Sequence, residues 1–146
     1  MTITKADFSG LKIMVIDDSL FVRRLVEEIL TSFGVGRIFS VESADKALAQ
    51  MEACCPDLII CDWQMHPVDG LTFLRRLRQE FAARYPRIPF IMLTGHSGTD
   101  DVSKAIGEGV DSYIVKPFSA QTLMNHLLKV IASESGSADN REAWVV

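Results

Sequence analysis

The sequence predicts an α/β protein of the (βα)5 class, in which a doubly wound, five-stranded parallel sheet carries helices on both faces. Five short apolar segments alternate with segments whose apolar residues recur at helical spacing. The first, third and fourth apolar segments are almost continuously hydrophobic, as strands buried on both faces of a parallel sheet are. Right-handed β-α-β crossovers then place helices on both faces. The pattern leaves the order of the strands open.

The apolar segments mark the expected strands, and polar residues or glycines mark where the helices begin. We expect strands at residues 11–16, 37–41, 58–61, 88–93 and 112–115. Helices are expected to begin after the possible N-caps Ser19 and Ser43, at Gly70, at Thr99 or Asp100, and at Ser119. Gly34 should end the first helix, since glycine is favoured just past a helix C-terminus.

Length, charge and hydropathy indicate one soluble domain. The 146 residues suit a single domain, and we expect an N-terminal leader at 1–10, the domain at 11–132 and a C-terminal tail at 133–146. The net charge of −4 argues against a nucleic-acid partner. No apolar run approaches the roughly 20 residues that a membrane span needs, and no secretory segment opens the chain. We therefore expect a cytoplasmic protein without membrane contact.

Two groups of residues are expected to be structural. The three cysteines lack the C-x-x-C spacing of a metal site, and we expect them to be reduced, buried thiols: Cys54, Cys55 and Cys61. The arginines of the third helix are expected to lie on a solvated face rather than to bind an anionic partner.

Charged and polar residues stand where the expected strands end. Asp17 and Asp18 follow the first strand, Asp62 the third, Thr94 the fourth and Lys116 the fifth. Because the carboxyl ends of parallel strands share one edge, these side chains should converge. Carboxylates so close repel one another, and a hard cation such as Mg²⁺ binds oxygen ligands while sharing phosphate oxygens. We therefore expect a Mg²⁺ site with room for a phosphoryl group.

Asp62 is the best candidate nucleophile at this edge. A carboxylate can attack phosphorus and form an acyl phosphate. Asp62 stands alone after a buried strand, whereas Asp17 and Asp18 are paired as a metal-binding couple would be. Thr94 and Lys116 could then bind the phosphoryl oxygens that the metal leaves free.

This set of residues resembles the receiver domain of two-component response regulators, the CheY-like family, whose fold is flavodoxin-like. The family has an acidic pair after the first strand, a phosphoaccepting Asp after the third, Ser or Thr after the fourth and Lys-Pro after the fifth. The resemblance covers about residues 10 to 132. The matching residues are Asp17-Asp18, Asp62, Thr94 and Lys116-Pro117, with Met65, Asp69 and Gly70 in the loop after Asp62.

The resemblance implies a phosphoryl donor and a metal. A phosphohistidine on a histidine kinase or a histidine phosphotransfer protein would donate its phosphoryl group to Asp62. The side chains of Asp18 and Asp62 and the backbone carbonyl of Gln64 would bind Mg²⁺. Asp17 would contribute mainly through water.

The resemblance also implies how the phosphoryl group is contacted and read. Thr94 and Lys116 would contact the phosphoryl group. Tyr113 matches the switch aromatic that turns inward when Thr94 moves. This movement would change the face made by the fourth helix, the fifth strand and the fifth helix, where a protein target would bind.

Four residues are candidates for tuning how fast the acyl phosphate is hydrolysed. Gln64 and His96 occupy the family's rate-tuning positions, and Gly95 is a small residue that leaves the phosphate reachable. His66 lies in the loop after Asp62, where a histidine could move protons. The family usually has Met-Pro in this loop, but here Met65-His66-Pro67 displaces the proline by one residue.

The function expected is that of a stand-alone response regulator that signals by phosphorylation-dependent protein contact. It would be no enzyme beyond its own phosphoryl transfer and dephosphorylation. The alternative is a Mg²⁺-dependent phosphatase with an aspartyl-phosphate intermediate, but haloacid-dehalogenase-like enzymes need D-x-D, and Asp62-Trp63-Gln64 lacks the second Asp. A flavodoxin-like flavin binder is disfavoured because Asp17-Asp18 would repel the flavin phosphate.

Overall fold

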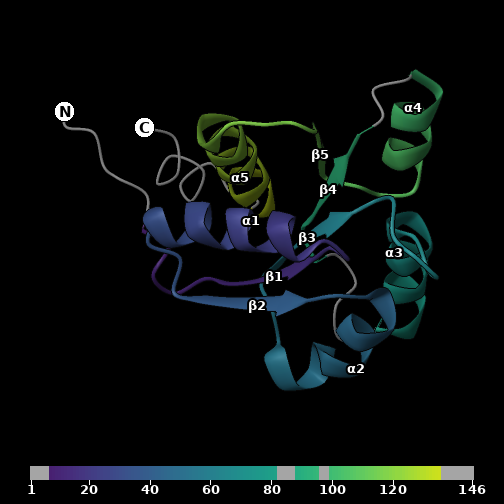
Figure 1. Cartoon of the computed structure of the whole chain (residues 1–146), viewed down its shortest axis with the longest axis horizontal. Helices are drawn as coiled ribbons and strands as arrows, with labels where there is room; N and C mark the ends of the chain where they lie inside the picture. Colours follow the sequence, from purple (N-terminus) through teal and green to yellow (C-terminus); the bar gives the residue numbers. More distant parts are fainter. Residues whose placement is uncertain (1–6, 82–87, 96–98, 136–146) are drawn as a thin grey trace.

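The computed structural model describes residues 7–81, 88–95 and 99–135 and confirms the five-stranded α/β fold (Figure 1). Strands and helices alternate along the chain. The strands are β1 (Lys12–Ile16), β2 (Arg37–Val41), β3 (Leu58–Asp62), β4 (Phe90–Thr94) and β5 (Ser112–Val115). The helices are α1 (Leu20–Ser32), α2 (Ala44–Cys54), α3 (Gly70–Glu80), α4 (Thr99–Gly107) and α5 (Ala120–Ser135).

The five strands form one parallel sheet in the order β2-β1-β3-β4-β5. This order is already known for the flavodoxin-like class, of which the CheY receiver is an example. From β1 the chain winds first to β2 and then back across to β3, so the winding direction reverses between β1 and β3. Ile16 pairs with Cys61, and Asp62 pairs with Leu93. The carboxyl ends of the three central strands therefore lie level with one another at this reversal.

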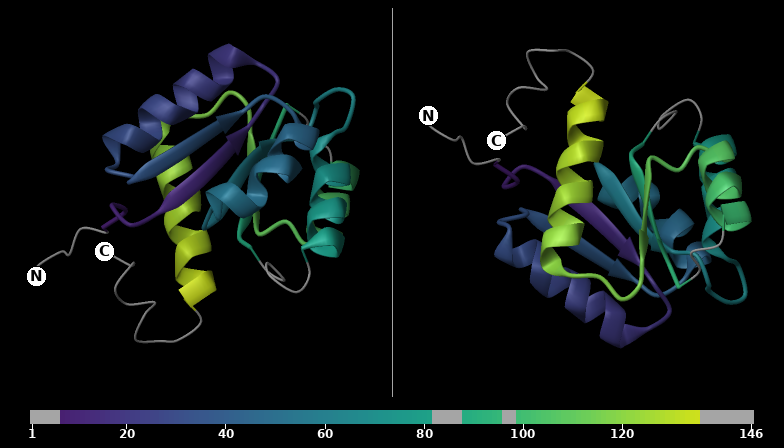
Figure 2. Two further views of the ribbon diagram at one scale, coloured as in Figure 1. Left: turned by 90° about the horizontal axis from the view of Figure 1, so that it is seen from below. Right: turned by 90° about the horizontal axis from the view of Figure 1, so that it is seen from above.

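Helices cover both faces of the sheet (Figure 2), and alternate residues of the sheet face two separate hydrophobic layers. Ile13 and Val15 pack with the buried residues of α1 and α5. Met14 and Ile16 pack on the opposite face with the buried residues of α2, α3 and α4. Because both faces are covered, β3 and β4 are buried at every position. This explains their continuous apolar sequences.

Side-chain caps begin four of the helices, among them α5, where the hydroxyl of Ser119 accepts from the Thr122 N–H at 3.1 Å. The hydroxyl of Ser19 accepts from the Val22 N–H at 3.3 Å and the hydroxyl of Ser43 from the Lys46 N–H at 3.2 Å. The N-cap of α3 is Asp69, which accepts from the Thr72 N–H at 2.8 Å. Each oxygen satisfies an N–H group that has no partner within its helix.

The ends of two expected strands differ from the structure in a way that concerns the charged edge. β3 and β4 include Asp62 and Thr94, which the sequence places just after the strands. Sheet hydrogen bonding continues past them, because the Trp63 N–H donates to the Leu93 carbonyl at 2.8 Å and the Lys116 N–H to the Thr94 carbonyl at 2.7 Å. Asp62 and Thr94 are therefore held by the sheet rather than by loops.

The cysteines and arginines depart in part from expectation. All three cysteines are free thiols, and Cys61 is buried as expected, but Cys55 is exposed at the end of α2. Arg78 is not on a solvated face, since its side chain is only 21% exposed and donates to the carbonyls of Ile88 and Gly109. It thus ties α3 to the segments that flank β4 and β5.

The division of the chain at residues 11 and 132 stays a prediction. α5 is helical as far as Ser135, and the C-terminal tail from residue 136 lies outside the described residues. Over the part of the chain that the structure describes, no helix is both long and apolar enough to cross a bilayer.

Candidate phosphoacceptor and metal site

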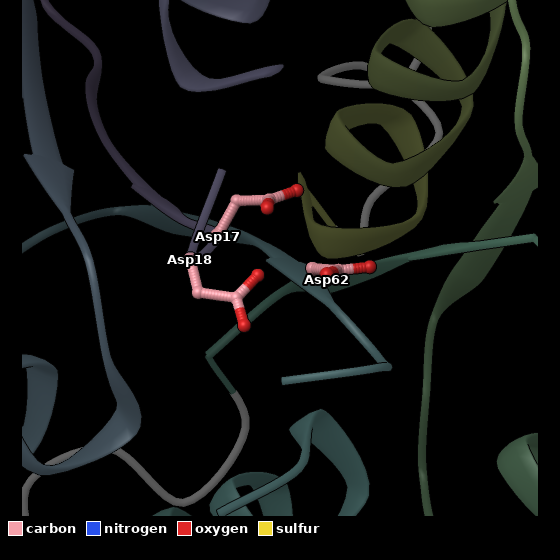
Figure 3. Close-up of side chains that lie close together, drawn as sticks. All are labelled: Asp17, Asp18 and Asp62. Carbon is pink, nitrogen blue, oxygen red and sulfur yellow. The ribbon is translucent and has the colours of Figure 1, made fainter. Parts of the chain in front are cut away.

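Three carboxylates meet at the carboxyl ends of β1 and β3 (Figure 3). Asp17 and Asp18 follow β1, and Asp62 ends the neighbouring strand β3. One carboxylate oxygen from each lies within 4.8 Å of the others. Asp17 and Asp62 are buried, at 0% and 3% exposure, while Asp18 is exposed. The cluster therefore has a buried floor and one side that solutes can reach.

Hydrogen bonds hold Asp17 and its loop in place. One carboxylate oxygen of Asp17 accepts from the Ser19 N–H at 2.8 Å. The Arg23 guanidinium donates to the backbone carbonyl of Asp17 at 2.6 Å and to the hydroxyl of Ser40 at 3.0 Å. Sequence reasoning missed Arg23, because Arg23 and Arg24 are adjacent and the helical pattern does not show which of them turns toward the acidic loop.

Lys116 supplies the cation of the cluster. Its Nζ donates to Asp62 Oδ1 at 2.9 Å and to Asp17 Oδ2 at 3.4 Å. Burial raises the pKa of Asp62, the Lys116 hydrogen bond opposes this rise, and the charge of Asp17 adds to it. Burial alone would lower the pKa of Lys116, but its contacts with Asp62 and Asp17 outweigh burial and raise it. Lys116 thus stabilises two buried carboxylates.

We expect Lys116→Met to destabilise the metal-free protein by about 2 kcal/mol. Removing one partner of a fully buried ion pair costs about 3 to 5 kcal/mol, and the Lys116 side chain is 25% exposed, which weakens the interaction. Urea unfolding in the absence of divalent cations measures this decrease in the free energy of unfolding.

The same variant should show a defined pH dependence. A carboxyl group whose pKa is raised by folding favours the folded state when protonated, and this contribution is lost as the pH rises through its folded pKa. Asp62 is such a group. The difference in the free energy of unfolding between Lys116→Met and the unmodified protein should therefore become smaller as the pH falls from about 7 to about 4. A difference in the free energy of unfolding that stays constant or grows over this pH range would contradict this account.

Thr94 and Gly95 lie beside Gln64 at the end of β4. Thr94 is 1% exposed and its hydroxyl accepts from Gln64 Nε2 at 3.3 Å. The Gly95 N–H donates to Gln64 Oε1 at 3.4 Å. The structure thus brings together three residues that the sequence singled out separately.

The other predicted residues lie farther from the carboxylates. His66 is exposed and lines a shallow pocket of about 420 Å³ with Trp63 and Pro67. Tyr113 in β5 is half-buried against the α2–α4 side of the sheet. His96 lies outside the described residues.

Gly70 permits the loop after Asp62 to fold back on the site. Its N–H donates to the Trp63 carbonyl at 2.8 Å. A Cβ at this position would lie 2.4 Å from the Asp62 carbonyl oxygen and 2.9 Å from Met92 Sδ. Only glycine fits this close approach. The family motif predicted the glycine, and the packing supplies its physical reason.

The donor atoms at the edge fit a hard divalent cation. Asp18 and Asp62 offer carboxylate oxygens from neighbouring strand ends, which suit Mg²⁺. Asp17 is already bound to the Ser19 N–H and Lys116, so it is suited to act on a metal through water. Lys116 contacts Oδ1 of Asp62.

This combination of sheet order and acidic edge agrees with the comparison to known families. The family model of the response regulator receiver domain matches residues 13–128. The chain therefore belongs to this family, the phosphorelay signalling proteins of two-component systems.

Its relatives include chemotaxis regulators of similar length. The chain is 34% identical over 129 residues to the chemotaxis protein CheY homolog of Campylobacter jejuni, covering 86% of this chain and 96% of that protein. It is 32% identical over 124 residues to chemotaxis protein CheY1 of Helicobacter pylori, covering 84% and 98%. The solved structure of chemotaxis protein CheY4 of Vibrio cholerae aligns with a TM-score of 0.76 at 28% identity, covering 82% and 98%.

Proposed function

We propose that the chain is a stand-alone, cytoplasmic response regulator whose receiver domain, residues 11–132, accepts a phosphoryl group on Asp62 from a phosphohistidine. The donor is a histidine kinase or a histidine phosphotransfer protein. The observation that carries this proposal is the position of Asp62: it is buried at the end of β3, bound to Lys116 and within 4.8 Å of two further carboxylates.

Each residue at the carboxyl edge of the sheet has its own role in the proposed phosphoryl transfer. A carboxylate oxygen of Asp62 forms a bond to phosphorus while the phosphorus–nitrogen bond of the phosphohistidine breaks, and the departing imidazole keeps the electron pair. Asp18, Asp62 and the Gln64 carbonyl would hold Mg²⁺, with Asp17 acting through water, and the bound ion would offset charge on the phosphoryl oxygens. Lys116, whose hydrogen bond opposes the rise in the pKa of Asp62 on burial, and the Thr94 hydroxyl would bind the oxygens left free. Gln64, His66, Gly95 and His96 then set the rate of hydrolysis.

The output surface of the proposal is the groove between α4, β5 and α5. The groove has a volume of about 440 Å³ and includes Ile106, Tyr113 and Val115 among its lining residues. Ile106 is 60% exposed and Val115 is 36% exposed, so apolar surface is available to a protein target. Movement of Thr94 and Tyr113 on phosphorylation would change this groove.

The test is phosphorylation by a small donor. Acetyl phosphate with Mg²⁺ should add one phosphoryl group to the intact chain, as read by mass spectrometry. Chelation of Mg²⁺, or the variant Asp18→Ala, should slow the labelling at least about tenfold, since the loss of even an outer-shell partner of a metal ligand weakens metal affinity or activity by about this factor. Labelling that proceeds equally well without a divalent cation would refute the proposed metal site.

A further inference from the structure

We propose that the side-chain amide of Gln64 is a latch that holds Thr94 and Gly95 in their resting positions and opens when Asp62 is phosphorylated. The inference rests on the proposed function and extends it to the resting state. Gln64 contacts both residues at once, through Nε2 to the Thr94 hydroxyl and through Oε1 from the Gly95 N–H. One side chain thus connects the loop after β3 to the end of β4.

The donors and acceptors define the orientation of the amide. The Gly95 N–H can only donate, so it must face Oε1 rather than the NH₂ group of Gln64. This places Nε2 at the Thr94 hydroxyl oxygen, 3.3 Å away, where it donates. Turning the amide by half a rotation would set two donors against each other at Gly95. The two contacts therefore support a single arrangement.

Phosphorylation creates a competing acceptor for the Gly95 N–H and a new acceptor for the hydrogen of the Thr94 hydroxyl. A phosphoryl group on Asp62 carries charged oxygens beside the end of β4, because Asp62 pairs with Leu93, the residue before Thr94. The Thr94 hydroxyl and the Gly95 N–H are donors at this strand end. A charged oxygen accepts a stronger hydrogen bond than the neutral amide oxygen of Gln64 does. The phosphoryl group should therefore displace Gln64 from the Gly95 N–H. The Thr94 hydroxyl, which accepts from Nε2 in the resting state, should donate to a phosphoryl oxygen and move away from Nε2.

A contact made only in the resting state opposes the switch. Removing it shifts the equilibrium toward the phosphorylated form, because only the resting form loses stabilisation. Gln64 is exposed and both hydrogen bonds are long, at 3.3 and 3.4 Å. The latch is therefore weak, and the effect of removing it should be moderate. Changing the side chain leaves the backbone carbonyl of Gln64 in place, so proposed metal binding is retained.

The experiment measures the affinity for beryllofluoride, an aspartyl-phosphate analogue, in the presence of Mg²⁺. Trp63 fluorescence reports binding, in a Trp144→Phe background that removes the second tryptophan of the chain. Gln64→Ala and Gln64→Met should both bind about fivefold more tightly, the size expected for losing two long hydrogen bonds. Gln50→Ala, at an exposed glutamine on α2, is the matched control and should leave the affinity unchanged.

Dependence on Thr94 separates a latch from a general structural effect. In a Thr94→Val background, the fivefold gain from Gln64→Ala should shrink to about twofold, because only the Gly95 contact remains to be lost. Unchanged or weaker beryllofluoride binding by both Gln64 variants would overturn the latch, since it would mean that the contact persists in the phosphorylated form.

The latch can also be tested on the unphosphorylated protein, independently of the proposed function. Amide hydrogen exchange of the Gly95 N–H should be faster in Gln64→Ala than in the unmodified chain, and an equal rate would overturn the latch. Beryllofluoride binding by the unmodified chain but not by Asp62→Asn supports the proposed function whatever the Gln64 variants do. If the unmodified chain does not bind beryllofluoride, the proposed function and the opening step both fail.

Discussion

Asp62→Asn is expected to abolish labelling by acetyl phosphate, while the fold remains intact. Asparagine has the same shape, and its amide oxygen can still accept from Lys116 as Asp62 Oδ1 does at 2.9 Å. The amide lacks the anionic oxygen that attacks phosphorus. Because burial raises the pKa of Asp62, replacing its ionised form with a neutral group should also stabilise the metal-free protein slightly.

The matched control lies at the other end of the same strand. Asp57 directly precedes β3 and accepts from the Lys12 N–H at 2.9 Å. Asp57→Asn keeps an oxygen that can accept this hydrogen bond and should be labelled at the rate of the unmodified chain. Intact-mass spectra over a time course provide the comparison. Labelling of Asp62→Asn at an undiminished rate would remove Asp62 as the phosphoacceptor.

Gly70→Ala is expected to lower the free energy of unfolding by about 3 kcal/mol, the upper part of the range for overpacking. Its Cβ would lie 2.4 Å from the Asp62 carbonyl oxygen and 3.0 Å from Trp63 Cα. Both neighbours are backbone atoms, and Trp63 is also bound to β4 through the Leu93 carbonyl. The backbone therefore has to shift at Asp62, the proposed phosphoacceptor, and we expect slower phosphorylation of the folded fraction.

Gly107→Ala is the control for the effect of adding a methyl group. Apart from Gly107 itself, its chain neighbours and the nearby backbone of its own helix, no described heavy atom lies within 4 Å of a Cβ built at Gly107, and its φ is outside the left-handed region. Alanine is favoured over glycine in a helix by up to about 1 kcal/mol, so this variant should be neutral or slightly stabilised. Urea unfolding of both variants measures the difference. Equal stability of Gly70→Ala and Gly107→Ala would show that the loop after Asp62 can shift to accommodate the added methyl group without a loss of stability.

The charged edge was predictable because polar residues after buried strands are conspicuous in sequence. Asp17, Asp62, Thr94 and Lys116 each interrupt or follow an apolar segment. Parallel strands bring their carboxyl ends to one edge whatever their order. The convergence could therefore be predicted without the strand order, which the apolar pattern alone leaves open. The structure adds that β1 and β3 are neighbours, which explains why the three carboxylates come so close.

The supporting contacts could not be predicted, because they depend on side-chain direction between distant segments. Arg23 reaches the Asp17 carbonyl from α1, and Gln64 reaches across to Thr94, thirty residues later in the chain. Helical periodicity does not distinguish Arg23 from Arg24, and a loop residue such as Gln64 has no periodicity. Glycine at position 70 is visible in sequence, but the backbone atoms that exclude a side chain there belong to the tertiary structure.

Lys116 has a consequence for how regulators of this kind can be recombined. It follows β5 directly, reaches Asp62 on β3, and bonds through its own N–H to the Thr94 carbonyl. Tyr113 and Val115, which line the groove on β5, precede it on the same strand. Lys116 at the proposed phosphoacceptor site thus lies one to three residues from the β5 residues of the proposed recognition surface, at most about 10 Å of extended chain. A chimera that exchanges the proposed recognition surface should therefore take β5 and Lys116 together from the same parent protein. The crossover between the two parent sequences is then placed upstream of β4.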